Sequence, residues 1–140
     1  MEFKVEKNEQ YALISLKDTA LTQENYEDFE KLVRNLFRID YTNMIVDFAS
    51  IESLDGYGVS VIRKAHKICA NEMGLFVIVT KNDEIIDQLD AAKIEDLTIM
   101  PTIEEAVDAV YLNDLENDFH SEEDDEFGGS EFEGGTEDDY

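Results

Sequence analysis

Met44-Ile45-Val46-Asp47-Phe48 is followed by Ala49-Ser50-Ile51-Glu52-Ser53-Leu54 and then by Asp55-Gly56-Tyr57-Gly58, and this stretch decides the fold of the chain. The apolar run 44–48 is too short for a typical helix and predicts a buried strand, whereas residues 59–73 return to helical spacing. Glycines allow backbone conformations that other residues resist. A loop that leads from a strand into a helix presents unpaired backbone N–H groups, so we expect residues 55–58 to receive a phosphate or a partner's carboxylate. The alternative is a connector that only turns the chain.

The composition favours one domain in a reducing compartment. A chain of 140 residues can bury a core of its own without disulfides. Cys69 is the single cysteine, so an internal disulfide and a multi-cysteine zinc site are excluded, and its position in a helical stretch favours a buried packing role. The N-terminus alternates apolar and charged residues and lacks the apolar core of a signal peptide, and no apolar run is long enough to span a membrane. We therefore expect a soluble, cytoplasmic protein.

The net charge of −24 is concentrated toward the C-terminus. From residue 113 onward the sequence has thirteen Asp and Glu and no Lys or Arg, so the first 112 residues carry 22 acids against 11 bases. Residues 113–140 contain few apolar side chains and predict a disordered acidic tail, which either keeps the protein soluble or docks on a basic partner. Repulsion by this charge argues against direct binding of nucleic acid.

Within residues 1–112 the pattern alternates between strands and helices. We expect two N-terminal strands joined by a turn at residues 7–10, a helix capped by Thr22, the strand 44–48, and a helix over 59–73 that Gly74 closes. The most continuous apolar run, 75–79, predicts the strand in the middle of the sheet. Asn82 caps a short helix, 97–100 form the last strand, and Thr102 with Glu105 has the capping-box spacing of a final helix. The expected fold is an α/β sandwich.

Catalytic patterns are weak in this sequence. His66 and His120 are the two histidines, and their spacing does not make a metal site. Gly58-Val59-Ser60-Val61-Ile62 lacks the second glycine of a serine hydrolase elbow. Gly56-Tyr57-Gly58 lacks the third glycine of a dinucleotide loop, and no Gly-Lys-Ser/Thr motif occurs. The sequence therefore predicts a protein without catalytic residues, cofactor or bound metal, rather than an enzyme.

Residues 44–79 carry a resemblance to a known family. An Ile-Val-Asp-Phe strand, a loop with an Asp-x-x-Gly motif, an apolar helix ending at glycine and a Leu-Phe-Val-Ile-Val strand follow one another without a gap. This order resembles the STAS domain of bacterial anti-sigma factor antagonists, and the similarity covers roughly residues 3–112. The resemblance implies a STAS-like sandwich, with a mixed β-sheet of four to five strands packed against about four helices. The family motif is Asp-Ser-Ser-Gly, so Asp55 matches its aspartate, Gly58 matches its glycine, and Tyr57 stands at the phosphorylated serine.

The resemblance implies a partner-switching regulator. Such a protein binds an anti-sigma factor or kinase-like ATPase domain protein and so affects sigma-factor-dependent transcription. The implied partner-binding residues are Ser53, Asp55, Gly56, Tyr57, Gly58, Ser60 and Arg63. In the family, a serine kinase phosphorylates the motif serine and so releases the antagonist from its partner. Tyr57 is not a serine, and its aromatic side chain suits an interface anchor.

Two alternatives to this function remain open at the level of sequence. The first is a regulatory or structural STAS subunit of a membrane transport complex of the ABC type, in which the same loop docks a cytoplasmic ATPase. The second, binding of a nucleotide or lipid at the loop, is disfavoured because no Lys or Arg lies between Arg38 and Arg63. The oligomeric state and the identity of the partner are not indicated by the sequence.

Overall fold

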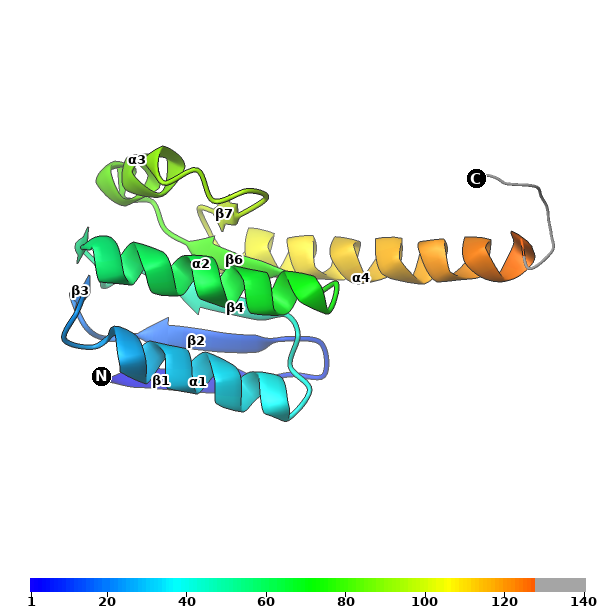
Figure 1. The fold of residues 1–140 in the computed structure, drawn as a ribbon, viewed down its shortest axis with the longest axis horizontal. Coiled ribbons are helices and arrows are strands. Elements are labelled where there is room, and N and C mark those ends of the chain that lie inside the picture. Colours follow the sequence, from blue (N-terminus) through cyan, green and yellow to red (C-terminus); the bar gives the residue numbers. More distant parts are fainter. Residues whose placement is uncertain (128–140) are drawn as a thin grey trace. The chain divides into compact units, whose positions relative to one another are not determined.

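The computed structural model describes the backbone of residues 1–127 and the side chains of residues 1–118 (Figure 1). It confirms the expected fold class, an α/β sandwich in which a mixed sheet of five strands packs against helices. The elements in chain order are β1 (Phe3–Lys7), β2 (Ala12–Leu16), β3 (Ala20–Leu21), α1 (Tyr26–Arg38), β4 (Met44–Asp47), β5 (Ser53–Leu54), α2 (Gly56–Asn71), β6 (Phe76–Val79), α3 (Asp83–Ala91), β7 (Thr98–Met100) and α4 (Ile103–Phe127).

The main sheet has the strand order β1-β2-β4-β6-β7. The N-terminal hairpin pairs β1 with β2 antiparallel, as the sequence predicts, and the remaining neighbours are parallel. The central strand is β4, so the prediction that residues 75–79 form the middle of the sheet is wrong by one strand. Both β4 and β6 are interior strands with nearly continuous apolar sequences, because each is covered on both faces.

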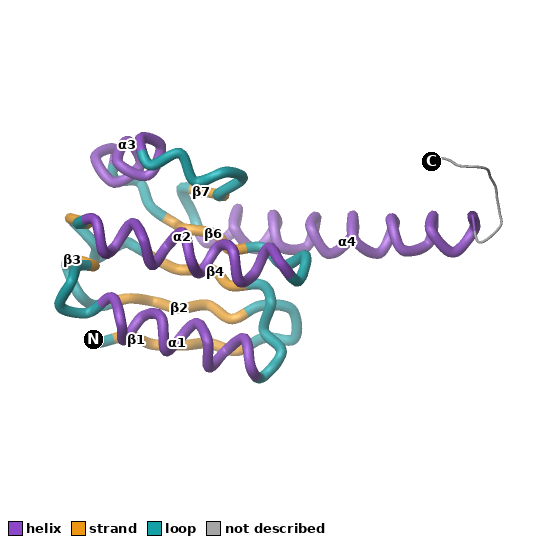
Figure 2. Tube along the Cα trace, viewed as in Figure 1, coloured by secondary structure: helices purple, strands orange, loops and turns teal. Residues whose placement is uncertain are grey.

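Side chains alternate along these strands between two separate cores. On one face, residues such as Met44, Val46 and Ile78 pack with buried residues of α1, α2 and α3. On the other face, Ile45 and Val77 pack with the first turns of α4. Figure 2 shows α1 and α2 side by side over the sheet, with the N-terminal ends of both helices at the same edge.

Helix α1 begins later than the sequence predicts. Thr22 was the expected N-cap, but residues 22–25 form a turn and the helix starts at Tyr26, with Asn25 at its N-cap position. The Asn25 side chain does not cap the helix. Instead, its amide donates to Asp18 Oδ2 and to the Ala20 carbonyl, and its Oδ1 accepts from the Thr22 N–H. Asn25 therefore fixes the turn that precedes the helix.

Helix α2 ends in a Schellman motif whose left-handed residue is Met73, not Gly74. The Met73 N–H donates to the Ala70 carbonyl and the Gly74 N–H donates to the Cys69 carbonyl, which is the paired pattern of this motif. Met73 has φ 62°, whereas Gly74 has no left-handed φ. Gly74 is needed for another reason, since a Cβ there would collide with the carbonyl oxygen of Thr42.

The backbone contacts divide the chain into two compact units, Met1–Val110 and a second that starts at Tyr111. Helix α4 continues to Phe127, so the backbone of 113–127 is helical where the sequence predicts disorder. The physical reason is that residues 102–127 contain neither glycine nor proline, and the first glycines come at 128–129. The rest of the predicted tail, 128–140, lies outside the described residues, and the boundary at residue 112 stays a prediction.

Candidate functional site

A small second sheet positions the start of α2. Strand β5 follows the loop after β4 and pairs parallel with β3, so that Ala20 lies opposite Ser53 and Leu21 opposite Leu54. The Glu52 N–H donates to the Thr19 carbonyl at 2.6 Å, next to this pairing. The segment before α1 and the segment before α2 are thereby joined, although they lie more than thirty residues apart in the sequence.

Asp55 is the N-cap of α2, so residues 56–58 are the first turn of a helix rather than an open loop. Its Oδ1 accepts from the Gly58 N–H at 2.9 Å, and its Oδ2 accepts from the Gln23 N–H at 3.0 Å. The hydrogen bond from Gly58 lowers the pKa of Asp55 below its usual range, and the bond from Gln23 acts in the same direction. At least one N–H group of the helix N-terminus, that of Gly58, is therefore already bound by a carboxylate. The expectation that residues 55–58 receive a phosphate or a partner's carboxylate stays a prediction.

The two glycines of this turn have different roles. A Cβ at Gly58 would collide with the carbonyl oxygen of Leu21 in β3, whereas a Cβ at Gly56 would meet no atom within 4 Å. Neither glycine has a left-handed φ. Gly58 is thus required by the close approach of α2 to β3, and the expectation that both glycines serve unusual backbone conformations is wrong.

Tyr57 stands on the exposed side of this first turn. It is 45% exposed, and its ring lies against the ring of Tyr26, the first residue of α1, with a centroid distance of 5.1 Å and a tilt of 36°. Desolvation raises the pKa of Tyr26, and the nearby Glu27 adds to the effect. Tyr26 is a neighbour of the site that the sequence does not indicate, because nothing in the spacing of residues 26 and 57 shows that the two helices begin side by side.

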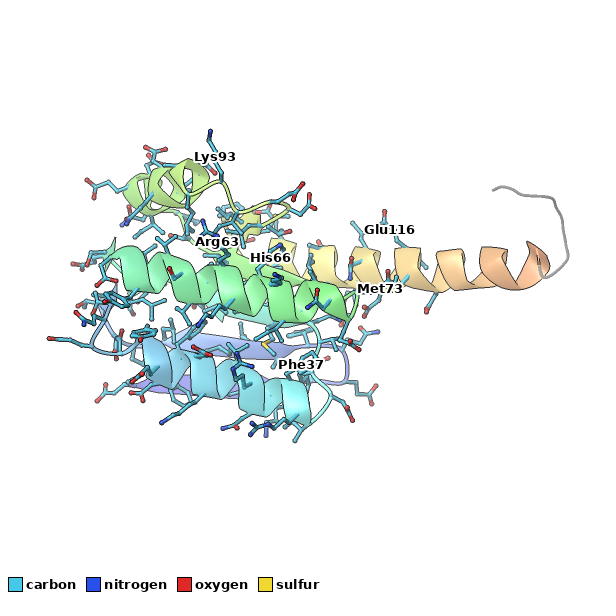
Figure 3. All side chains as sticks on the ribbon, in the orientation of Figure 1. Phe37, Arg63, His66, Met73, Lys93 and Glu116 are labelled. Carbon is cyan, nitrogen blue, oxygen red and sulfur yellow. The ribbon has the colours of Figure 1, made fainter. Side chains whose placement is uncertain are left out.

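The structure gathers most of the predicted site residues but not Arg63. Ser53 is exposed in β5, and exposed Ser60 lies one turn after Tyr57 on the same side of α2. Arg63 is six residues after Tyr57, about 240° around the helix. Its Nη2 donates to the Ala92 carbonyl at 2.9 Å, and Figure 3 shows it with His66 on the side of α2 that faces the connection after α3.

The basic residue on the Tyr57 side of α2 is Lys64. It lies seven residues after Tyr57, and its Nζ is 3.7 Å from Glu30 Oε1 of α1. Arg34 Nε is 3.0 Å from the other oxygen of Glu30. Because the Arg34 and Lys64 side chains are at least half exposed, these ion pairs contribute little to stability. A helical count from Tyr57 would have selected Lys64 instead of Arg63.

The largest cavity described in the structure lies elsewhere. A cavity of about 510 Å³ is lined at the carboxyl ends of β4, β6 and β7 by residues that include Phe48, Val79 and Thr102, and none of Asp55, Gly56 and Tyr57 lines it. Among the residues that the structure describes, no group of three His, Cys, Asp or Glu side chains is arranged to hold a metal ion. Within the same residues, no helix is both long and apolar enough to cross a membrane.

The family model of the STAS domain matches residues 3–108 of this chain. The chain therefore belongs to the STAS domain family. Among curated proteins, none matches the sequence.

Solved structures share the fold. A Thermotoga maritima protein that has been proposed to be an anti-sigma factor antagonist has 22% identity and a TM-score of 0.64, with 78% of this chain and 94% of that chain covered. The Bacillus cell fate determinant SpoIIAA in its phosphorylated form has 18% identity and a TM-score of 0.62, over 78% and 99% of the two chains. The murine anion transporter Slc26a9 has 16% identity and a TM-score of 0.65, over 76% of this chain and 18% of the transporter.

Proposed function

We propose that this protein is a partner-switching regulator of the anti-sigma factor antagonist type, without enzymatic activity. In this proposal it acts in the cytoplasm, binds an anti-sigma factor or kinase-like ATPase domain protein, and so affects sigma-factor-dependent transcription. The proposed contact surface is the first turn of α2 with its neighbours, formed by Ser53, Asp55, Gly56, Tyr57 and Ser60. Gly58 is buried against β3, so its proposed part is to hold this turn in place. Membership in the STAS family supports it, as does the fold shared with SpoIIAA, which is an anti-sigma factor antagonist.

The single observation that carries the proposal is the presentation of Tyr57. Its side chain is exposed, yet its backbone is fixed by the Asp55 cap and its ring rests against Tyr26. A partly exposed aromatic ring that is already held in place loses little conformational entropy on binding, and such residues are frequent binding hot spots. Tyr57 is therefore suited to anchor a protein partner.

Tyr57 also bears on how the proposed interaction would be regulated. It stands at the position where the family has its phosphorylated serine, and a serine kinase has no serine to modify there. The exposed Ser53 and Ser60 flank the position but lie on β5 and one turn further along α2. Regulation by protein abundance, or by modification outside position 57, is the form of switching that fits this site.

Arg63 is not part of the proposed contact surface, because its guanidinium holds the carbonyl of Ala92 at the end of α3. Lys64 takes its place in the proposal. It extends the Tyr57 side of α2 toward α1, where it pairs with Glu30. A mixed polar rim around an aromatic anchor is the usual anatomy of a protein interface.

A second candidate is a STAS subunit of a membrane transport complex, in which the same surface docks a cytoplasmic ATPase. The observation that favours it is the match to an anion transporter chain, whose covered part has the same fold. The two candidates share the contact surface and differ in the partner, which is a regulator of sigma factors in the first case and a membrane-associated ATPase in the second.

The experiment is affinity purification of the full-length protein from its native cells, with wild type, Tyr57→Ala and Phe3→Ala in parallel. Phe3 is a matched control, since it is an aromatic residue with a similar exposed fraction, 43%, on the edge strand β1. We expect an anti-sigma or kinase-like protein that is enriched with wild type and Phe3→Ala and lost with Tyr57→Ala. Recovery of a membrane transporter's ATPase instead would support the second candidate, and equal recovery with all three variants would refute the proposed surface.

A further inference from the structure

Helix α4 presents an apolar stripe in the second unit of the chain. Tyr111, Leu112 and Leu115 are 43%, 61% and 64% exposed, and their spacing places them on one side of the helix. Leu112 and Leu115 are the most exposed large hydrophobic residues of the part of the chain whose side chains are described. Single exposed leucines need no explanation, but a stripe that follows helical spacing indicates an interaction face.

The charge around this stripe restricts what can cover it. Glu116 and Asp118 follow it directly, and from residue 113 onward the chain has thirteen acids and no base. Figure 3 shows the labelled Glu116 projecting outward from α4. A second copy of this chain would bring the same acidic segment alongside, and nucleic acids and anionic membranes would be repelled in the same way. The complementary surface is apolar at its centre and basic at its edges.

We propose that α4 from Tyr111 onward docks as an amphipathic helix into an apolar groove rimmed by Lys and Arg on a partner protein. Leu112 and Leu115 would fill the groove, and the acidic residues would steer the encounter and pair with the rim. This surface is separate in sequence from residues 53–60, so it would act as a second attachment point. Two linked contacts raise the effective concentration of each at the other and increase the overall affinity.

The test uses the full-length protein and a fluorescently labelled synthetic peptide that folds as a helical hairpin, whose two helices form an apolar groove of Leu side chains rimmed by Lys. Binding is followed by fluorescence anisotropy with wild type, the double variant Leu112→Ser plus Leu115→Ser, and the control Ile39→Ser. Ile39 is an apolar residue at the end of α1 that is 52% exposed. A peptide of the same composition in scrambled order measures attraction by charge alone. Circular dichroism of the double variant verifies that the fold is retained.

We expect saturable binding of the labelled peptide to the wild type. The double variant should raise the dissociation constant by about tenfold or more, and Ile39→Ser should change it by less than about twofold. The scrambled peptide should not bind in this way. Tyr57→Ala should leave this binding unchanged, so failure here is distinguishable from failure of the proposed function. Equal binding of the scrambled peptide, or an unaffected double variant, would overturn the proposal. So would a dimer in analytical ultracentrifugation that the double variant abolishes, because a second copy would then cover the stripe.

Discussion

Gly58 lacks a side chain because the Leu21 carbonyl oxygen occupies the space that a Cβ would fill. This close approach lets the first turn of α2 rest on β3, and it brings the exposed Tyr57 next to the start of α1. The geometry of the site therefore depends on two single-residue features, the absence of a Cβ atom at residue 58 and the carboxylate of Asp55.

We predict that Gly58→Ala destabilises the protein by about 2 kcal/mol, because α2 must move away from β3 to accommodate the new Cβ. Gly56→Ala is the matched control in the same turn. Its Cβ enters open space and the unfolded chain loses freedom, so stability should stay the same or rise by up to about 1 kcal/mol. Urea unfolding of both variants measures the difference, and equal destabilisation would contradict the assigned role of Gly58.

The lowered pKa of Asp55 makes the free energy of unfolding depend on pH in a specific way. Its pKa is lowered in the folded protein by the hydrogen bond from Gly58, so its ionised form stabilises the fold above the unfolded-state pKa of about 3.9. This stabilisation is lost as the pH falls through the lower, folded-state pKa. Asp55→Asn keeps an acceptor for the Gly58 N–H but removes the charge.

The comparison of wild type with Asp55→Asn isolates this one carboxyl from the many others. We expect the variant to be less stable than wild type by a constant difference between pH 6 and pH 8, measured by urea unfolding. The difference should shrink as the pH is lowered below about 4. A difference that does not change with pH would show that the charge of Asp55 makes no contribution.

At the scale of elements, the ends of the helices follow hydrogen-bond patterns that local sequence signals predict only in part. Both α1 and α2 end in Schellman motifs, with Asp40 and Met73 in the left-handed conformation. Glycine is the usual residue at the left-handed position of this motif. In α2 the glycine comes one residue later, at Gly74, where a Cβ would collide with the carbonyl oxygen of Thr42. A side-chain-bearing residue in the left-handed region costs about 1 kcal/mol.

We therefore predict that Met73→Gly stabilises the protein by about 1 kcal/mol, since it removes that cost and Met73 is largely exposed. Ala70→Gly is the control, because residue 70 lies within α2 with ordinary helical geometry, where glycine destabilises by about 1 kcal/mol. Thermal unfolding of the two variants should move in opposite directions. A loss of stability with Met73→Gly would mean that its side chain makes contacts worth more than the backbone strain.

The order of the major elements follows from the periodicity of the sequence, because strands such as β6 and helices such as α2 bury whole apolar faces. Strands β3 and β5 could not be predicted in this way, since two residues are too few to show a period. The predicted α2 begins at residue 59 and misses the N-cap, although Asp55 precedes Gly58 at the spacing of a side chain that caps a helix. The contact of Tyr57 with Tyr26 needs the tertiary structure.

At the scale of the whole molecule, the two cores on opposite faces of the sheet both lie within the compact unit Met1–Val110. The reactivity of Cys69 measures the unfolding of this unit. Its thiol is fully buried in the core between α2 and the sheet, and burial raises the pKa of the thiol to about 12. A thiol reacts as the thiolate, which is scarce at pH 8 when the pKa is that high, and the reagent cannot reach the sulfur in the folded state. Modification of Cys69 therefore requires unfolding of the core.

We predict that Cys69 in the native protein reacts with a disulfide reagent at pH 8 at least about 10³-fold more slowly than in the urea-unfolded chain, because unfolded molecules are that rare. Gly58→Ala should accelerate the native reaction by roughly 30-fold, which corresponds to its expected loss of about 2 kcal/mol. Tyr57→Ala should leave the rate nearly unchanged, because the Tyr57 ring is 45% exposed and belongs to neither core. Fast labelling of the wild type would mean that α2 opens locally without the rest of the fold, and the candidate site on its first turn would then be a mobile surface instead of a rigid one.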